Sequence, residues 1–142
     1  IYTTNGNGQL TVWTCRNWTR ERTIDLHNNE PSRCVAPSLD GKLVATCGQD
    51  SIARILKTDD FSEIASFDLS SNRVVDLALL DGGGTLLSVD DRGVSLWSVP
   101  EESEIYTIGN QPGIPITRAA SNGKVLAIFE TFGHLRLHRG KE

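Results

Sequence analysis

The chain has 142 residues, of which 38% are hydrophobic, and its 14 basic and 18 acidic side chains give a formal net charge of −4. This hydrophobic content is typical of a folded globular domain and excludes a disordered chain. The charges are spread evenly over both halves, so there is no broad basic field of the kind that drives non-specific nucleic-acid binding. No apolar run approaches the roughly 18–20 residues of a membrane-spanning helix, and we expect no membrane partner.

Short runs in which apolar and polar residues alternate predict β-strands along the whole chain. In chain order, the runs cover residues 9–13, 42–47, 51–56, 85–89, 93–97, 124–129 and 134–138. Turn-forming pairs, among them Asn5-Gly6, Asp40-Gly41, Asp81-Gly82 and Asn122-Gly123, separate the runs. Helical periodicity of useful length is missing from the sequence, so the predicted fold class is all-β.

The ends of the strands and the turns share one period. The last large residues of the alternating runs recur about every 41 positions, at Trp13, Leu56, Trp97 and His138. The turn pairs that begin at Asp40, Asp81 and Asn122 recur at the same interval. Four short antiparallel strands in about 40 residues are typical of one blade of a β-propeller.

Residues 38–58, SLDGKLVATCGQDSIARILKT, resemble the second and third strands of a WD repeat. Residues 5–15, 81–99 and 121–140 fit the same template more loosely. The resemblance implies that Asp50 and Asp91 are the structural turn aspartates, and that Trp13, Leu56 and Trp97 pack between blades. The Trp-Asp pair of the family stands nowhere in the sequence, and only His27 can represent the histidine of its Gly-His pair.

The resemblance also implies a single propeller segment, with blades at about residues 1–28, 32–70, 73–110 and 115–142. We expect three, four, four and three strands in these blades, because the first lacks its inner strand and the last its outer strand. Such a segment exposes unpaired strand edges. We therefore expect an incomplete propeller, whose remaining blades come from the same polypeptide or from another chain.

Candidate partner-binding residues lie where the predicted inner strands begin. Arg33, Arg73 and Arg118 each lie near such a start, one in each repeat. In WD-repeat proteins this rim and the residues just before the turn aspartate commonly contact partners, and the matching positions here are Gln49 and Asp90. Arginines suit an acidic peptide or a phosphate, because the guanidinium group makes bidentate contacts. The alternative is that these arginines are solvated or pair with acidic residues of nearby loops.

Patterns that indicate catalysis or metal binding are weak. His134 and His138 would lie roughly 13 Å apart on a strand, too far to share an ion. Gly82-Gly83-Gly84 is not followed by the Lys-Ser/Thr of a phosphate-binding loop. The paired carboxylates, such as Asp59-Asp60, fall in predicted loops. We therefore expect no enzymatic activity, no cofactor and no metal.

The functional hypothesis follows from the predicted fold. The sequence contains no Cys-x-x-Cys pair, so Cys15, Cys34 and Cys47 are expected to be reduced thiols of an intracellular protein, cytoplasmic or nuclear. The leading hypothesis is a non-enzymatic protein–protein interaction scaffold within a larger multi-subunit complex. The alternative is a ribonucleoprotein or ribosome-assembly component that contacts RNA through basic rim residues, since residues 117–142 carry a mild basic excess.

Overall fold

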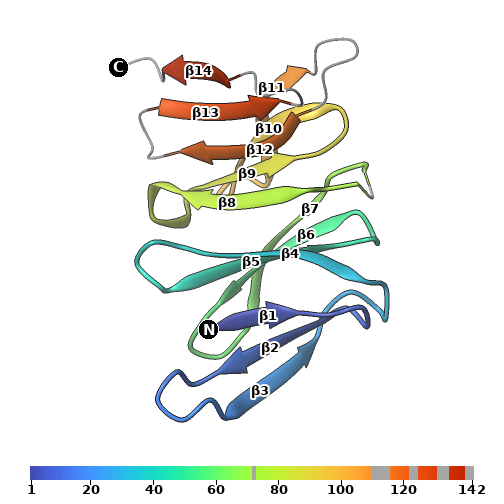
Figure 1. The fold of residues 1–142 in the computed structure, drawn as a ribbon, viewed down its shortest axis with the longest axis vertical. Helices are drawn as coiled ribbons and strands as arrows, with labels where there is room; N and C mark the ends of the chain where they lie inside the picture. Colours follow the sequence, from blue (N-terminus) through green and yellow to red (C-terminus); the bar gives the residue numbers. More distant parts are fainter. Residues whose placement is uncertain (72, 110–115, 122–124, 131–134, 140–142) are drawn as a thin grey trace.

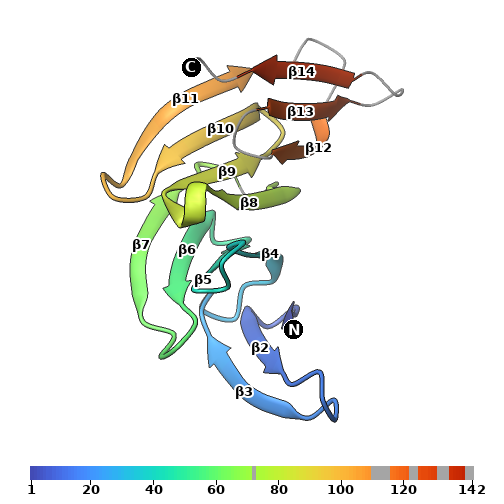
Figure 2. The same ribbon diagram turned by 90° about the vertical axis from the view of Figure 1, so that its left-hand side faces the viewer.

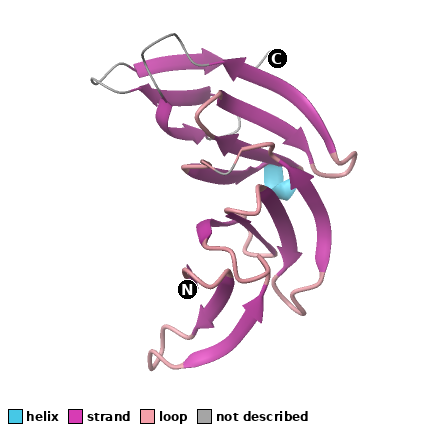
Figure 3. Cartoon of the chain, turned by 90° about the vertical axis from the view of Figure 1, so that its right-hand side faces the viewer, coloured by secondary structure: helices cyan, strands magenta, loops and turns pink. Residues whose placement is uncertain are grey.

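Antiparallel β-strands form almost all of this chain, as the sequence predicts. The computed structural model describes residues 1–71, 73–109, 116–121, 125–130 and 135–139, with side chains as far as residue 109. Within these ranges the one helical element is a short 3-10 turn, η1 (Asp81–Gly83), which Figure 3 shows in cyan. No helix among the described residues is long and apolar enough to span a membrane.

The first two sheets occupy the N-terminal half. The first sheet contains β1 (Tyr2–Thr4), β2 (Gln9–Trp13) and β3 (Arg20–Asp25). The second contains β4 (Ser32–Pro37), β5 (Leu43–Gly48), β6 (Ile52–Lys57) and β7 (Glu63–Asp68). In both sheets each strand pairs with the next one in the sequence, so every connection is a hairpin.

The last two sheets repeat this arrangement. The third contains β8 (Asp76–Leu80), β9 (Thr85–Val89), β10 (Gly93–Ser98) and β11 (Ser103–Gly109). The fourth contains β12 (Ile116–Ser121), β13 (Val125–Glu130) and β14 (Leu135–Arg139). The described strands thus fall into groups of three, four, four and three, the grouping expected from the sequence.

A β-bulge recurs at the same point in the first three sheets. The register shifts at Val12/Trp13 between β2 and β3, at Ile55/Leu56 between β6 and β7, and at Leu96/Trp97 between β10 and β11. A bulge increases the local twist of its strand. The residues that define the period in the sequence therefore mark the same irregularity in the backbone of each sheet.

The four sheets follow one another along an arc (Figures 1 and 2). Strand β1 lies beside β4, β4 beside β8, and β8 beside β12. Strands β3, β7 and β11 lie on the convex side of the arc (Figure 2). Each sheet can therefore bury one face against the sheet that follows it.

The hydrophobic core consists of clusters associated with the faces of successive sheets. Leu10 of the first sheet packs with Val44 and Leu56 of the second. A larger cluster joins the second and third sheets and includes Phe67 and Trp97, whose ring centroids are 5.6 Å apart. Stability thus depends on contacts between sheets, because a single sheet of three or four strands has no interior of its own.

The third sheet begins later than the sequence indicates. Its first strand starts at Asp76, whereas the predicted strand began at Arg73. Before the strand, the backbone N–H of Arg73 donates to Oγ of Ser71 at 3.2 Å. The following hairpin turns through Gly83 at φ +100°, and a Cβ there would lie 2.4 Å from Cδ1 of Leu43. Glycine is therefore required where this turn meets the second sheet.

Replacement of Trp97 tests the packing between the second and third sheets. Trp97 is 9% exposed and contacts Phe67, so Trp97→Ala should lower the free energy of unfolding by about 3–5 kcal/mol. This change is measured from urea unfolding curves that are monitored by circular dichroism. Trp97→Phe should cost clearly less, because a ring still fills the space. A loss below about 1 kcal/mol for Trp97→Ala would contradict the packing.

Candidate interaction surface

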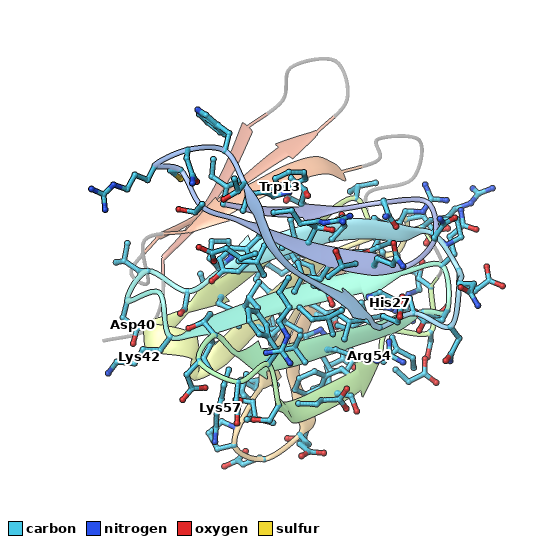
Figure 4. All side chains as sticks on the ribbon, turned by 90° about the horizontal axis from the view of Figure 1, so that it is seen from below. Trp13, His27, Asp40, Lys42, Arg54 and Lys57 are labelled. Carbon is cyan, nitrogen blue, oxygen red and sulfur yellow. The ribbon has the colours of Figure 1, made fainter. Side chains whose placement is uncertain are left out.

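The loops that precede the first strands of the second and third sheets lie at one edge of the molecule. We call it the strand-start rim and define it as segments 26–31 and 69–75 together with the turns 49–51 and 90–92. Figure 4 shows His27 and Arg54 toward this end of the second sheet, whereas Asp40, Lys42 and Lys57 lie toward the opposite end. The described partner-binding candidates lie on or next to this rim.

The structure places Arg33 and Gln49 beside each other and Arg73 on the neighbouring sheet. Arg33 is exposed in β4, and the backbone N–H of Gln49 donates to the carbonyl of Pro31 at 2.9 Å, at the start of the same strand. Arg73 is exposed in the segment before β8, and β8 lies beside β4. Arg118 lies in β12, but its side chain is outside the part of the chain whose side chains are described.

Asp90 and Asp91 exchange the roles that the sequence suggests. Asp90 is 5% exposed, and its Oδ1 accepts the backbone N–H groups of Arg92 and Gly93 at 2.7 and 3.1 Å. Asp91 is exposed and accepts a hydrogen bond from Ser71 at 3.0 Å. Both turns span three residues, 49–51 and 90–92, but the aspartate whose Oδ1 accepts backbone N–H groups is the second residue of the first turn and the first residue of the second. Counting back six positions from Trp97 therefore selects Asp91 and not Asp90. Asp90 is a buried turn residue and is not available at the rim surface.

A buried polar cluster lies beneath the rim, between the first and second sheets. His27 is 0% exposed, and its Nδ1 lies 2.9 and 3.1 Å from the two carboxylate oxygens of Asp50. Its Nε2 lies 3.2 Å from Oγ1 of Thr46. Arg54 donates to Asp50 at 2.7 Å and its Nε lies 3.5 Å from Glu63. The cluster therefore ties the linker after β3 to β5, β6 and the turn between them.

The space for the imidazole depends on Gly48. A Cβ at this position would lie 2.7 Å from Cγ of His27, closer than side-chain atoms approach one another. Glycine here leaves room for the ring to stand against the end of β5. The position of His27 thus depends on the glycine at position 48 as well as on its own hydrogen bonds.

Burial favours a neutral imidazole at His27, and hydrogen bonds favour an ionised carboxylate at Asp50. Burial lowers the pKa of His27, and the charge of Arg54 acts in the same direction, outweighing the opposing effect of Asp50. Burial alone would raise the pKa of Asp50, but hydrogen bonds from Arg54, the backbone of Ile52 and His27 lower it overall. Nδ1 of His27 faces both the Asp50 carboxylate and a guanidinium N–H donor of Arg54, which lies 2.8 Å from it, while Nε2 faces the Thr46 hydroxyl, a group that can donate or accept.

Hydroxyl groups occupy equivalent places in the first three sheets. In each of these sheets, one hydroxyl residue lies opposite the position two residues before the strand-ending residue. The hydroxyl residues are Thr3 in the sheet of Trp13, Thr46 in the sheet of Leu56 and Ser88 in the sheet of Trp97. The indole of Trp13 donates to Thr3 at 2.8 Å, and that of Trp97 donates to Ser88 at 2.9 Å. Leu56 has no donor, and Thr46 bonds to His27 instead. A polar pair or cluster thus recurs beside the strand-ending residue of each of the first three sheets.

The hairpins at the opposite end of the strands also repeat. Trp18 and Phe61 both have a left-handed backbone, with φ of 57° and 63°. Their backbone N–H groups donate to the carbonyls of Thr14 and Lys57, respectively, at 3.0 and 3.1 Å. Phe61 packs back on the first sheet, where the guanidinium of Arg22 lies 5.3 Å from its ring centroid. Trp18 is 69% exposed, and none of the described strands packs over it as the first sheet packs over Phe61.

Sequence analysis missed Thr46, Arg54, Trp18 and Phe61. A signal for two of them exists, because Trp18 and Phe61 follow the strand-ending residues Trp13 and Leu56 at the same distance. No comparable signal identifies Arg54, whose partners are Asp50 in the adjoining turn, Glu63 in β7 and His27 in the linker after β3. Among the residues with described side chains, no group of three or more His, Cys, Asp or Glu could hold a metal ion. Residue 134 lies outside the described ranges, so the expectation for His134 and His138 stays a prediction.

No protein-family model and no curated protein matches this sequence. The geometry of the described residues is therefore the ground on which function is argued.

The His27 cluster predicts a pH dependence of stability. In the unfolded chain His27 takes up a proton near its ordinary pKa of 6.5, whereas in the folded chain its pKa is lower. The folded state therefore binds fewer protons, and the free energy of unfolding should fall as pH drops below 6.5. Urea denaturation from pH 8 to 5 measures this slope, which should be smaller in His27→Gln. Equal slopes for the two proteins would contradict the buried neutral imidazole.

A matched pair of hairpin variants tests the contact between the first and second sheets. Phe61→Ala should lower the free energy of unfolding by about 2 kcal/mol, because the half-buried ring packs under Arg22. Trp18→Ala, at the equivalent position of the first sheet, should change it by less than about 0.5 kcal/mol, since this side chain is largely exposed. Thermal or urea denaturation of both variants gives the comparison. Equal losses would show that the two hairpins are not packed as described.

Proposed function

We propose that this chain forms consecutive blades of a WD-repeat-like β-propeller and acts as a non-enzymatic scaffold that binds other proteins of an intracellular complex. Several observations support the blades. The sheets are antiparallel meanders in chain order, and their first strands lie side by side along an arc. The bulges and the hydroxyl positions recur from sheet to sheet. A propeller is the arrangement in which such units bury both faces.

The uncovered face of the first sheet supports further blades in the same assembly. Leu56 and Phe61 of the second sheet are buried by the first sheet, whereas Trp13 and Trp18 hold the equivalent places on the first sheet. Trp13 is half-buried and Trp18 is 69% exposed. A further sheet of the same kind, from this polypeptide or another chain, would cover both tryptophans as the first sheet covers Leu56 and Phe61.

The observation that carries the scaffold function is the pair of exposed arginines near the starts of neighbouring sheets. Arg33 lies at the start of the second sheet and Arg73 just before the third, and their strands β4 and β8 are adjacent. Two guanidinium groups on a rigid edge suit a partner with carboxylates or phosphates, because each can make paired hydrogen bonds. The buried cluster of His27, Asp50 and Arg54 holds the loops of this edge in place. Gln49 adds a polar side chain beside Arg33.

Partner capture by charge-matched variants tests this proposal. The double variant Arg33→Ala with Arg73→Ala should recover at least about tenfold less partner from cell extract, equivalent to about 1.4 kcal/mol of binding energy. The control, Arg16→Ala with Arg20→Ala, removes the same charge from exposed residues of the β2–β3 hairpin and should change recovery little.

Both variants should keep the stability of the original chain, because all four arginines are exposed. Unchanged recovery by the Arg33/Arg73 variant would reject this rim as the binding site. Recovery of RNA that falls steeply with salt would favour the ribonucleoprotein alternative.

A further inference from the structure

Two cysteines face each other across the first strand pair of the second sheet. Cys34 in β4 pairs directly with Cys47 in β5. Directly opposed residues of antiparallel strands have Cα atoms about 4.5–5.5 Å apart and project to the same face. A disulfide needs a Cα separation of about 4.4–6.8 Å. The backbone therefore holds this pair at a spacing that a disulfide can bridge.

The two thiols also interact with each other. A hydrogen bond between the side chains of Cys34 and Cys47 is the largest cause that raises the pKa of Cys47, and burial is the next. Cys47 is 0% exposed, and Cys34 is half-buried against the same hydrophobic cluster between the second and third sheets. Because the sulfur atoms are already neighbours, a bond between them requires no exchange of strand partners.

The third cysteine provides an internal reference. Cys15 is exposed in the hairpin after β2, in the first sheet. Its sulfur lies 4.0 Å from the amino group of Ile1, far along the fold from the other two thiols. Reagents reach Cys15 first, so a preference for pairing Cys34 with Cys47 must come from the fold and not from exposure.

We propose that Cys34 and Cys47 form a redox-active dithiol, which closes to an intramolecular disulfide in the presence of a disulfide oxidant such as oxidised glutathione. The thiolate of Cys34, the more exposed of the two, attacks one sulfur of the oxidant, forms a mixed disulfide and releases one glutathione. Cys47 then loses its proton, and its sulfur attacks Sγ of Cys34 and releases the second glutathione. The two thiols lose two electrons and two protons, and the oxidant gains them.

The order of the steps follows from the environments of the two sulfurs. The thiolate is the attacking species, and the raised pKa of Cys47 keeps that residue protonated. Cys47 must therefore give up its proton before it attacks, so the mixed disulfide between Cys34 and glutathione precedes the internal disulfide. The bridge then joins β4 to β5. Because β4 lies between β1 and β8, this link restrains the strand that contacts both neighbouring sheets.

Oxidation of the complete 142-residue chain tests the proposal directly. The folded protein is equilibrated with reduced and oxidised glutathione at several ratios, the remaining thiols are alkylated, and the tryptic peptides are analysed by mass spectrometry without reduction. Trypsin cleaves after Arg33, Lys42 and Arg54, so Cys34 and Cys47 fall in separate peptides, 34–42 and 43–54. The expected product is these two peptides joined by a disulfide, with Cys15 alkylated or carrying glutathione alone.

The same reaction in denaturing urea supplies the control, because there the preference for the Cys34–Cys47 product over pairs that include Cys15 should decline. Cys47→Ala should stop at the mixed disulfide on Cys34, whereas Cys15→Ser should leave the bridge unchanged. The proposal is overturned if Cys34 and Cys47 remain alkylated at every ratio in the folded chain. It is equally overturned if the main disulfide contains Cys15.

Discussion

Burial of one sheet face against the next is the interaction on which the rest of this structure depends. A meander of three or four short strands can satisfy its internal hydrogen bonds but encloses no core. Leu10, Val44 and Leu56 form a core only because two sheets meet, and Phe67 reaches Trp97 only across the next interface. The arc in Figure 2 is the shape that results when this contact is repeated.

Packing sheets in this way brings polar atoms into the interfaces, and each described example has a partner. The indole N–H groups of Trp13 and Trp97 donate to hydroxyls in the neighbouring strand. In the second sheet the corresponding position is Leu56, which has no donor. There Thr46 forms a hydrogen bond with His27 and joins the cluster that contains Asp50 and Arg54. Such satisfied groups add little net stability but are costly to break, because a partner left alone in the interior loses its water as well. They therefore fix the loops above them more firmly than apolar packing alone would.

Strand β4 links the features discussed above. It lies between β1 and β8, it carries Arg33 at the exposed rim, and it presents Cys34 to Cys47 on its buried side. Binding at the rim would depend on exposed charge, whereas disulfide formation would depend on the register of two strands. A partner on the rim and an oxidant at the thiols would nevertheless act on the same strand.

The sequence by itself determined the all-β class and the central strands of each sheet, because alternation and turn residues act over a few neighbours, and the grouping of the strands followed from the repeated period and the resemblance that it supports. Even the bulges coincide with Trp13, Leu56 and Trp97, the residues that reveal the period. The tertiary structure decided which aspartate is buried, since Asp90 and not Asp91 accepts the backbone N–H groups of the turn before β10. It also brought His27 to Asp50 and Arg22 over Phe61, contacts between sheets that no local pattern encodes. Such contacts depend on the angle and distance at which two whole sheets pack. These are set by all the side chains buried between the sheets and not by the residues of any single strand.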